Sequence, residues 1–404
     1  MPLLFDDEQH DEFGTWALAY IPYGGADFGE IAAVAAQVGD GDDSAFYQAW
    51  VNFADRLVDE ADAAVAAGHT DSARELYLRA SAYYASAYHP LYGAPTDPRL
   101  IAAFDKQTAA FDAGLALGPH PVSPMRIPYE DTTLPAYLIP APGHETEQRP
   151  TIIFTNGYDA TITDMYFASA VAALRRGYHC VLFDGPGQGE MLYSQGVPMR
   201  PDWESVVSPV VDVIAAQDIV DAESIVLSGW SLGGFLAPRA ATRERRLAAV
   251  IADPAASSVG DSVRAFATAM GAPPEALDHP DEIAQEIIDK MTAIVESNPV
   301  MNWRVVKRGY WVNGVSDMRG FIEASLSYTL PDDATITCPV LATSAENDIL
   351  GAGAAAFVDR IGDKATLMTF TAAEGAGEHC EMTNRTLLNR RALDWLDDTL
   401  SARG

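Results

Sequence analysis

Apolar positions recur at helical spacing through the first part of the chain, from about Phe28 to Leu117. One such series is Phe46, Trp50, Phe53 and Leu57. Spacing of three and four residues is typical of helices with one buried face. We therefore expect an all-helical N-terminal cap domain over residues 1–122. A segment rich in glycine and proline, 117–124, ends this pattern, and the period changes after it.

Short apolar runs then alternate with helical segments, which is typical of a mostly parallel sheet covered by helices on both faces. We predict a catalytic domain built in this way over residues 123–404. No strand pattern occurs between Pro254 and Pro331, so residues 255–330 are expected to form a helical insertion after the sixth strand, contributing to a lid. The predicted strands are Met125–Tyr129, Leu134–Ile139, Thr151–Thr155, Cys180–Phe183, Ile225–Leu227, Leu247–Ile251, Val340–Thr343 and Thr366–Phe370.

Composition excludes several classes of partner. The 404 residues include 57 Asp and Glu against 26 Lys and Arg, a formal net charge of −31. This charge repels phosphate backbones and anionic lipid surfaces, so we expect neither a nucleic acid nor a membrane as partner. Three widely spaced cysteines suit a reducing compartment. The acidic start lacks the features of a secretory signal, and we predict a cytoplasmic protein.

Motifs for nucleotides and metals are missing from the sequence. The glycine-rich segment Asp184-Gly-Pro-Gly-Gln-Gly-Glu190 has neither the lysine of a phosphate-binding loop nor the spacing of a dinucleotide fingerprint. No H-E-x-x-H, paired C-x-x-C or carboxylate-rich calcium loop occurs. We therefore expect no metal and no cofactor, and a small molecule as the substrate.

The strongest chemical signal is a G-x-S-x-G pentapeptide between a predicted strand and a helical segment. It reads Gly229-Trp230-Ser231-Leu232-Gly233. Small residues two positions before and after the serine permit a turn sharp enough to hold its hydroxyl above the sheet. Ser231 is the candidate nucleophile.

A serine hydroxyl needs a neighbouring base, which is itself oriented by a carboxylate. His379 follows the last predicted strand, and both Glu346 and Asp348 follow the strand before it. We favour Asp348 over Glu346 because the shorter carboxylate, two residues deeper in the loop, matches the usual reach to an imidazole. Cys380, beside His379, is expected to be a packing residue.

The negative oxygen formed during such a reaction needs preorganised N–H donors. One is expected from the backbone of Leu232, directly after the nucleophile. The other is expected from Tyr158, in the loop after the third predicted strand. Gly157 precedes it and lets the backbone approach the substrate, and Asp159 follows it.

With the pentapeptide around Ser231, with Asp348 and with His379, the sequence resembles the α/β-hydrolase superfamily from roughly Pro124 to the C-terminus. A narrower branch is also similar, and with it the resemblance extends over nearly the whole chain. That branch contains fermentation/respiration-switch-like proteins, fungal polyketide-shortening pigment hydrolases and 2,6-dihydroxypseudooxynicotine hydrolase. The narrower resemblance rests on the helical N-terminal block and on three segments, 183–190, 202–209 and 377–380.

The resemblance implies the α/β-hydrolase fold, with a mostly parallel sheet of the eight-stranded type. It also implies a serine hydrolase that cleaves a carbon–carbon bond next to a ketone, or an ester, in a polyketide-like or aromatic molecule. Several members of the branch are dimers, so a homodimer is expected. Two alternatives stay open: an acyltransferase with the same triad, and a non-catalytic binding protein of the hydrolase fold.

Carbon–carbon cleavage needs a dry, aromatic-lined pocket in which a leaving carbanion is stabilised. Trp303 and Trp311 of the insertion could line it, although packing within a helical core explains such aromatic residues equally well. Asp261 is the nearest candidate for an extra carboxylate that some members of the branch use after the sixth strand. The full set of candidate pocket residues is Gly157, Asp159, Trp230, Tyr23, Tyr88, His89 and Asp261.

Overall fold

An eight-stranded sheet forms the centre of the computed structural model, which describes residues 3–403. The strand order is β1-β2-β4-β3-β5-β6-β7-β8. Strand β2 pairs antiparallel with β1 and β4, and the other neighbouring pairs are parallel. The bounds are β1 (Met125–Tyr129), β2 (Thr132–Ile139), β3 (Arg149–Thr155), β4 (His179–Phe183), β5 (Val220–Trp230), β6 (Leu247–Asp253), β7 (Val340–Ala345) and β8 (Ala365–Phe370).

The strands lie where the apolar runs predicted them, and the expected fold class is confirmed. The largest difference is β5, which begins at Val220 and not at Ile225. Residues 221–224 in its first half are at least partly exposed and mostly polar, so hydrophobicity could not reveal it. A register shift in the pairing of β3 with β5 accompanies this extension.

Five α-helices form the N-terminal block, in which α3 packs on α4 and α4 packs on α5. Four of them begin after an aspartate whose carboxylate accepts a backbone N–H of the first turn, a favourable N-cap. Two elements, α1 and the 3₁₀ segment η1, precede Phe28, where the helical spacing of apolar residues begins in the sequence. The elements are α1 (Glu8–Thr15), η1 (Trp16–Tyr23), α2 (Phe28–Val38), α3 (Asp43–Ala66), α4 (Thr70–Ala87), η2 (His89–Leu91) and α5 (Pro98–Ala116).

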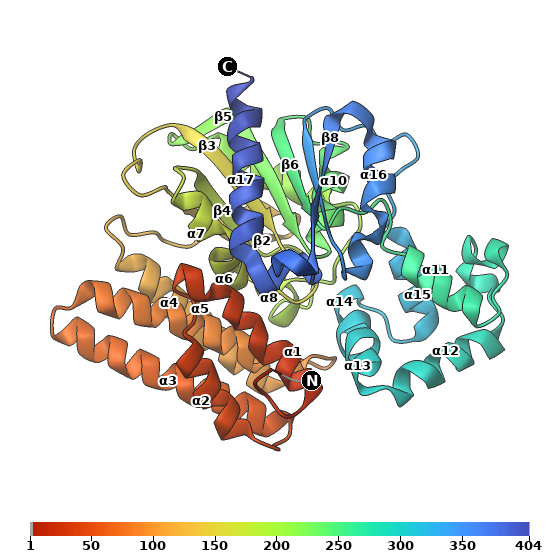
Figure 1. The fold of residues 1–404 in the computed structure, drawn as a ribbon, viewed down its shortest axis with the longest axis horizontal. Helices are drawn as coiled ribbons and strands as arrows, with labels where there is room; N and C mark the ends of the chain where they lie inside the picture. Colours follow the sequence, from red (N-terminus) through yellow and green to blue (C-terminus); the bar gives the residue numbers. More distant parts are fainter. Residues whose placement is uncertain (1–2, 404) are drawn as a thin grey trace.

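The chain between β6 and β7 forms the predicted helical insertion, which has a small apolar core of its own that includes Ile288, Met291 and Ile322. An isolated antiparallel bridge between Ser258 and Thr329 joins its two ends. In Figure 1 the insertion and the N-terminal helices lie beside each other at one end of the sheet. Its main elements are α11 (Asp261–Ala269), α12 (Gln285–Ser297), α13 (Pro299–Met301), the π-helical segment η6 (Asn302–Tyr310), α14 (Trp311–Asn313) and α15 (Met318–Ser327).

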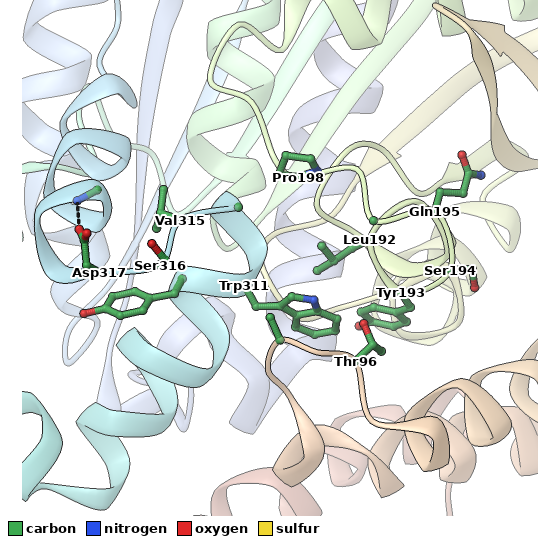
Figure 2. Close-up of a pocket in the computed structure, with 15 residues that line it drawn as sticks. Thr96, Leu192, Tyr193, Ser194, Gln195, Pro198, Trp311, Val315, Ser316 and Asp317 are labelled. Carbon is green, nitrogen blue, oxygen red and sulfur yellow. Dashed lines mark hydrogen bonds between the residues drawn. The ribbon is translucent and has the colours of Figure 1, made fainter.

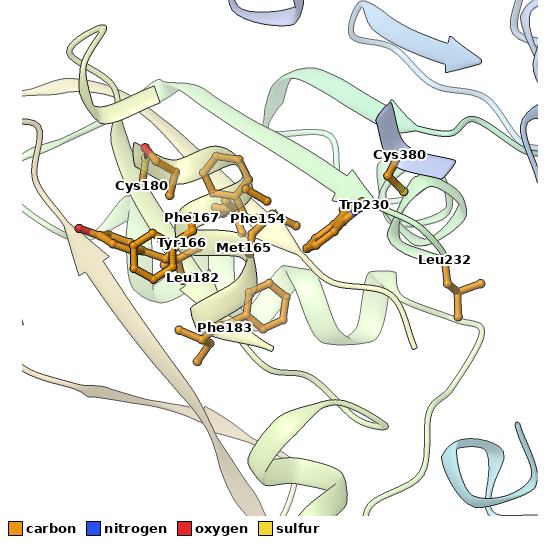
Figure 3. Close-up of a cluster of buried hydrophobic side chains, with 14 of the residues drawn as sticks. Phe154, Met165, Tyr166, Phe167, Cys180, Leu182, Phe183, Trp230, Leu232 and Cys380 are labelled. Atoms are coloured by element: carbon orange, nitrogen blue, oxygen red, sulfur yellow. Dashed lines mark hydrogen bonds between the residues drawn. The ribbon is translucent and has the colours of Figure 1, made fainter. Parts of the chain in front are cut away.

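The remaining helices pack around the sheet, α9 against α10 and α17 against α7. The main core lies between these layers, and Figure 3 shows part of it, where rings from β3, β4 and the segment after α6 meet. Trp230, Leu232 and Cys380 extend that core to the candidate site. The helices are α6 (Ile162–Met165), α7 (Val171–Leu174), α8 (Gly189–Tyr193), α9 (Glu204–Ala215), α10 (Gly233–Ala241), α16 (Ala354–Ile361) and α17 (Arg385–Ser401).

Candidate active site

Ser231 lies on a sharp turn between β5 and α10, with a φ of +60°. A residue with a side chain rarely adopts this left-handed conformation, so the surrounding structure must hold it there. The amide of Ser231 donates a hydrogen bond of 2.7 Å to the carbonyl of Asp253 at the end of β6. A Cβ at Gly229 would collide with the carbonyl of Gly233, so the turn requires glycine at that position.

The predicted triad of Ser231, His379 and Asp348 forms one chain of hydrogen bonds. His379 Nε2 lies 3.0 Å from Ser231 Oγ, and His379 Nδ1 lies 2.7 Å from Asp348 Oδ2. The side chain of Asp348 is 3% exposed and that of His379 is 32% exposed, so the imidazole is open to solvent or a ligand and its carboxylate partner is not. The three residues follow β5, β7 and β8, whose carboxyl ends meet at one edge of the sheet.

The environment of Asp348 keeps its carboxylate charged. Burial opposes ionisation, but hydrogen bonds from His379 and from the amides of Leu350 and Cys380 outweigh it, and the pKa of Asp348 is held below its usual value. Its carboxylate also caps the 3₁₀ segment η7 (Ile349–Gly353) through Leu350. Glu346, the alternative acid, instead accepts the amide of Ala372 on an exposed loop, at 2.7 Å.

The loop after β3 comes close to the nucleophile at Gly157. A Cβ at this position would lie 2.8 Å from Ser231 Cβ and 2.9 Å from the amide nitrogen of Leu232. Only glycine therefore fits there without displacing the turn. The hydroxyl of Tyr158 accepts a hydrogen bond of 3.1 Å from the Asn313 amide, which ties this loop to the insertion.

A second contact between the same loop and the insertion is the ion pair of Asp159 with Arg308, at 2.5 Å. The guanidinium carbon of Arg308 lies 5.3 Å from the ring centre of Tyr158 and 5.0 Å from that of Trp303. Burial opposes ionisation of Asp159, but Arg308, ahead of His89 and His379, lowers its pKa. The insertion and the loop thus meet through charged and aromatic contacts beside the candidate nucleophile.

Tryptophans of distant segments meet next to His379. Trp16 of η1 stacks on Trp230 with ring centres 5.7 Å apart, and lies 6.5 Å from the ring of His379. Trp303 donates its indole N–H to the carbonyl of His89, at 2.8 Å. Sequence reasoning missed Trp16 because η1 has no helical apolar period, and the only local sign of structure there is the preceding cap at Asp7.

The remaining candidate pocket residues have different environments. His89 packs between the rings of Phe13 and Tyr92, and its carbonyl accepts the indole N–H of Trp303. Tyr88 is buried in the helical block, where its hydroxyl donates to Gln107. The hydroxyl of Tyr23 accepts a hydrogen bond from Asn389 of α17, and its ring centre lies 5.4 Å from the guanidinium carbon of Arg175, so its place in a pocket stays a prediction.

Asp261 is an exposed residue at the start of α11, and its role as an extra carboxylate stays a prediction. The acidic residue next to the nucleophile's turn is Asp253, the last residue of β6. Its carboxylate is paired with Arg385 of α17 at 2.5 Å, and both side chains are 3% exposed. Its one sequence signal is an acid at the end of an otherwise apolar strand.

The two residues after His379, Cys380 (φ +53°) and Glu381 (φ +49°), both have left-handed backbone conformations. The Cys380 thiol is buried and points to the carbonyl of Asp253, at 3.7 Å. Burial raises its pKa, so packing is a better description of it than reactivity. Burial, followed by the neighbouring Asp253, raises the pKa of Glu381 to about 11, which keeps that carboxyl neutral.

Removing the partner of a buried charge should cost much more than removing a surface charge. Replacing Arg385 with methionine leaves Asp253 buried without its cation, and we expect a loss of about 3–5 kcal/mol in unfolding free energy. Arg391→Met on the same helix is the control, because Arg391 pairs with Glu374 where both side chains are 34% exposed. That change should cost at most about 1 kcal/mol. Urea denaturation measures both, and equal losses would contradict this account of the pair.

One groove described in the structure is separate from these residues. It has a volume of about 870 Å³ and lies between α8, the loop around Thr96 and the insertion. Figure 2 shows the rings of Tyr193 and Trp311 side by side at its wall, where they stack with centres 5.4 Å apart. None of Ser231, Asp348 or His379 lines it, and we assign it no role.

Residues 3–403 contain no helix long and apolar enough to cross a membrane. Within the same range, no group of three or more His, Cys, Asp or Glu residues is placed to hold a metal ion.

Residues 152–388 match the alpha/beta hydrolase family, which is more than half of the chain. The chain belongs to this family. Hydrolase LUC6 of Fusarium sp is 31% identical over 96% of this chain and 95% of its own length. The 20-hydroxy-prefusarin hydrolase FUS2 of Gibberella moniliformis is 30% identical, over 95% of this chain and 94% of its own. With such relatives over nearly the full length, the chain is a hydrolase.

Solved structures share the fold over the same extent. The 2,6-dihydroxy-pseudo-oxynicotine hydrolase superposes with a TM-score of 0.74 at 21% identity, covering 95% of this chain and 96% of that protein. AbyA5 superposes with a TM-score of 0.60 at 15% identity, covering 97% of this chain and 99% of that protein. The helical N-terminal block and the insertion are included in these superpositions, because nearly the whole chain is covered.

Proposed function

We propose that the protein is a serine hydrolase that cleaves a carbon–carbon bond next to a ketone, or an ester, in a polyketide-like or aromatic small molecule. The observation that carries the proposal is the unbroken chain of hydrogen bonds from Asp348 through His379 to Ser231. A charged Asp348 accepts the Nδ1–H of His379, so the lone pair of Nε2 is directed at the Ser231 hydroxyl. This is the arrangement that a general base needs.

In the proposed reaction Ser231 Oγ attacks the substrate carbonyl carbon while His379 Nε2 takes the hydroxyl proton. The resulting negative oxygen accepts hydrogen bonds from the amides of Leu232 and Tyr158. When the tetrahedral intermediate collapses, the leaving group departs with the bonding electron pair and receives the proton from His379. Water, deprotonated by the same imidazole, then attacks the acyl-enzyme, and Ser231 leaves with that proton.

The choice of leaving group depends on what surrounds the reacting carbon. An alkoxide leaves readily, whereas a carbon leaving group needs its charge delocalised into a neighbouring carbonyl or ring. Trp16 lies beside His379, and Tyr158 follows Gly157, which lies against Ser231; their rings could bind such a flat, conjugated group and exclude water. The relative FUS2 is named for its hydrolysis of 20-hydroxy-prefusarin, which supports an organic small molecule as the substrate. The homodimer and the cytoplasmic location stay predictions.

The test is covalent trapping of the nucleophile. A fluorophosphonate reacts when an activated serine displaces its fluoride, and we expect the native protein to gain one adduct on the peptide that carries Ser231. Heat-denatured protein is the control and should gain none. A p-nitrophenyl ester should also release a burst of nitrophenol, as an acyl-enzyme accumulates. A native protein that shows neither the adduct nor turnover of aryl esters and aryl 1,3-diketones would overturn the proposal.

A further inference from the structure

The glycine-rich segment 184–190, whose sequence lacks the known nucleotide-binding patterns, packs on the loop that carries Tyr158. Gln188 makes the contact through its side-chain amide. Its Nε2 donates to the carbonyl of Asn156 at 2.7 Å and to the carbonyl of Gly157 at 3.1 Å. Its Oε1 accepts the amide of Gly185 at 3.0 Å, which fixes which way the side chain faces. The residue is 1% exposed, so no water competes strongly for these bonds.

The two carbonyls belong to the peptide groups on either side of Gly157. The Gly157 carbonyl and the Tyr158 N–H are parts of the same peptide group. The cis peptide bonds among the described residues both precede proline, so the Gly157–Tyr158 peptide is trans. In a trans peptide the C=O and the N–H point in opposite directions. A side chain that holds the Gly157 oxygen on one side therefore turns the Tyr158 N–H to the other side.

The nucleophile lies close to this peptide. A Cβ on Gly157 would be 3.0 Å from Ser231 Oγ and 2.9 Å from the Leu232 nitrogen. Glycine is the residue whose backbone can rotate most freely, so a peptide next to Gly157 needs an external hold to keep one orientation. A second tie supports the loop, since the buried Asp184 accepts the amide of Ile162 at 3.1 Å.

We propose that Gln188 is a positioning residue that sets the Tyr158 amide as a donor to the negative oxygen of the reaction. This inference rests on the proposed function, because it presumes attack by Ser231. It gives the glycines of the segment a role as well. Gly187 and Gly189 have φ values of +79° and +39°, and a Cβ on Gly189 would collide with the Asp184 carboxylate. The sharp turn they allow brings Gln188 and Asp184 to the same loop.

Gln188→Met tests the proposal, because methionine keeps the length of the side chain and removes both donors. A misdirected amide is felt by the charged oxygen of the transition state more than by the ground-state carbonyl. We expect kcat for p-nitrophenyl ester hydrolysis to fall by about 10²–10³, with KM changed less than about threefold. Gln195→Met is the matched control, because Gln195 is an exposed glutamine just after α8 that bonds Glu190 and Thr132, and it should keep the parent rate.

A thionoester substrate distinguishes a misoriented Tyr158 amide from a general loss of activity in the variant. Sulfur accepts hydrogen bonds weakly, so its rate depends little on the Tyr158 amide. The parent should therefore prefer the oxygen ester much more strongly than Gln188→Met does, and we expect the ratio of the two rates to fall by about tenfold or more. A fall of both rates together, with the ratio unchanged, would overturn the inference, as would a parent-like kcat.

Gln188→Leu is the second variant if the methionine protein does not fold. Leucine has no donor for the two carbonyls at any pH, so the same loss of kcat and of the rate ratio is expected. Failure of this inference is distinct from failure of the proposed function. A parent protein labelled at Ser231, together with a variant of unchanged kcat and ratio, removes only the role of Gln188. A parent that is neither labelled nor active removes both.

Discussion

Replacing Ser231 with alanine is expected to lower kcat for aryl esters by about four to six orders of magnitude and to abolish fluorophosphonate labelling. The hydroxyl is the atom that bonds to the substrate, and its neighbours cannot replace it. Cys380 lies beside the imidazole, 3.4 Å from His379 Nε2, but its thiol is buried, and burial raises its pKa. Steady-state kinetics with p-nitrophenyl esters and intact-protein mass spectrometry measure the two effects.

Ser224→Ala is the matched control for this experiment. Ser224 lies on the same strand, β5, in the polar half away from the turn, and its loss should leave both labelling and turnover unchanged. Ser231→Ala removes only a hydroxyl group and keeps the same backbone turn, so the unfolding midpoints of the variant and the parent should differ by only a few degrees. A Ser231→Ala protein that still turns over esters within tenfold of the parent would place the nucleophile elsewhere.

Replacing Asp348 with asparagine should lower kcat by about 10⁴ while the fold stays intact. The amide can offer an N–H to His379 Nδ1, which stabilises the wrong tautomer and leaves a proton on the nitrogen that faces Ser231. The carboxylate also stabilises the imidazolium that forms during attack. Both contributions depend on a charged Asp348. Because its pKa is held below the usual value, they persist into mildly acidic solution and are lost only as pH falls through that lowered pKa.

Glu346→Gln distinguishes the two acids of this loop. Its carboxylate accepts the amide of Ala372, and the side-chain oxygen of glutamine can accept the same bond, so kcat should stay within about twofold of the parent. The reverse outcome, a large loss with Glu346→Gln and a small one with Asp348→Asn, would mean that the loop rearranges in solution and that the hydrogen-bonded chain runs through the other acid. Both variants are compared at the same pH.

Local patterns made much of this protein predictable. The strands follow from short apolar runs, because a strand buried on both faces needs apolar residues at successive positions. The turn at Ser231 follows from glycines at fixed offsets, because a tight strand-to-helix turn excludes side chains there. The choice of Asp348 and His379 used their places after the seventh and eighth strands, and the structure brings both within hydrogen-bond distance of one another.

Contacts between distant segments were not predictable in this way. Trp16 meets His379 from a position more than three hundred residues earlier in the chain, in a 3₁₀ segment without an apolar period. Arg308 pairs with Asp159, and Asp253 with Arg385, although nothing next to either arginine indicates its partner. Tyr23 and Asp261 were selected from the sequence alone, and only the assembled chain shows that Tyr23 bonds Asn389 and that Asp261 is exposed.

The division has a physical reason. The periodicity of apolar residues and the turn residues reflect the backbone hydrogen bonds of one segment and the burial of one of its faces. That information lies within about ten positions of the chain. The orientation of the Tyr158 amide, in contrast, depends on a glutamine that the packing of the sheet brings against it. This contact forms only when the segments have assembled, so the sequence of one segment alone does not predict it.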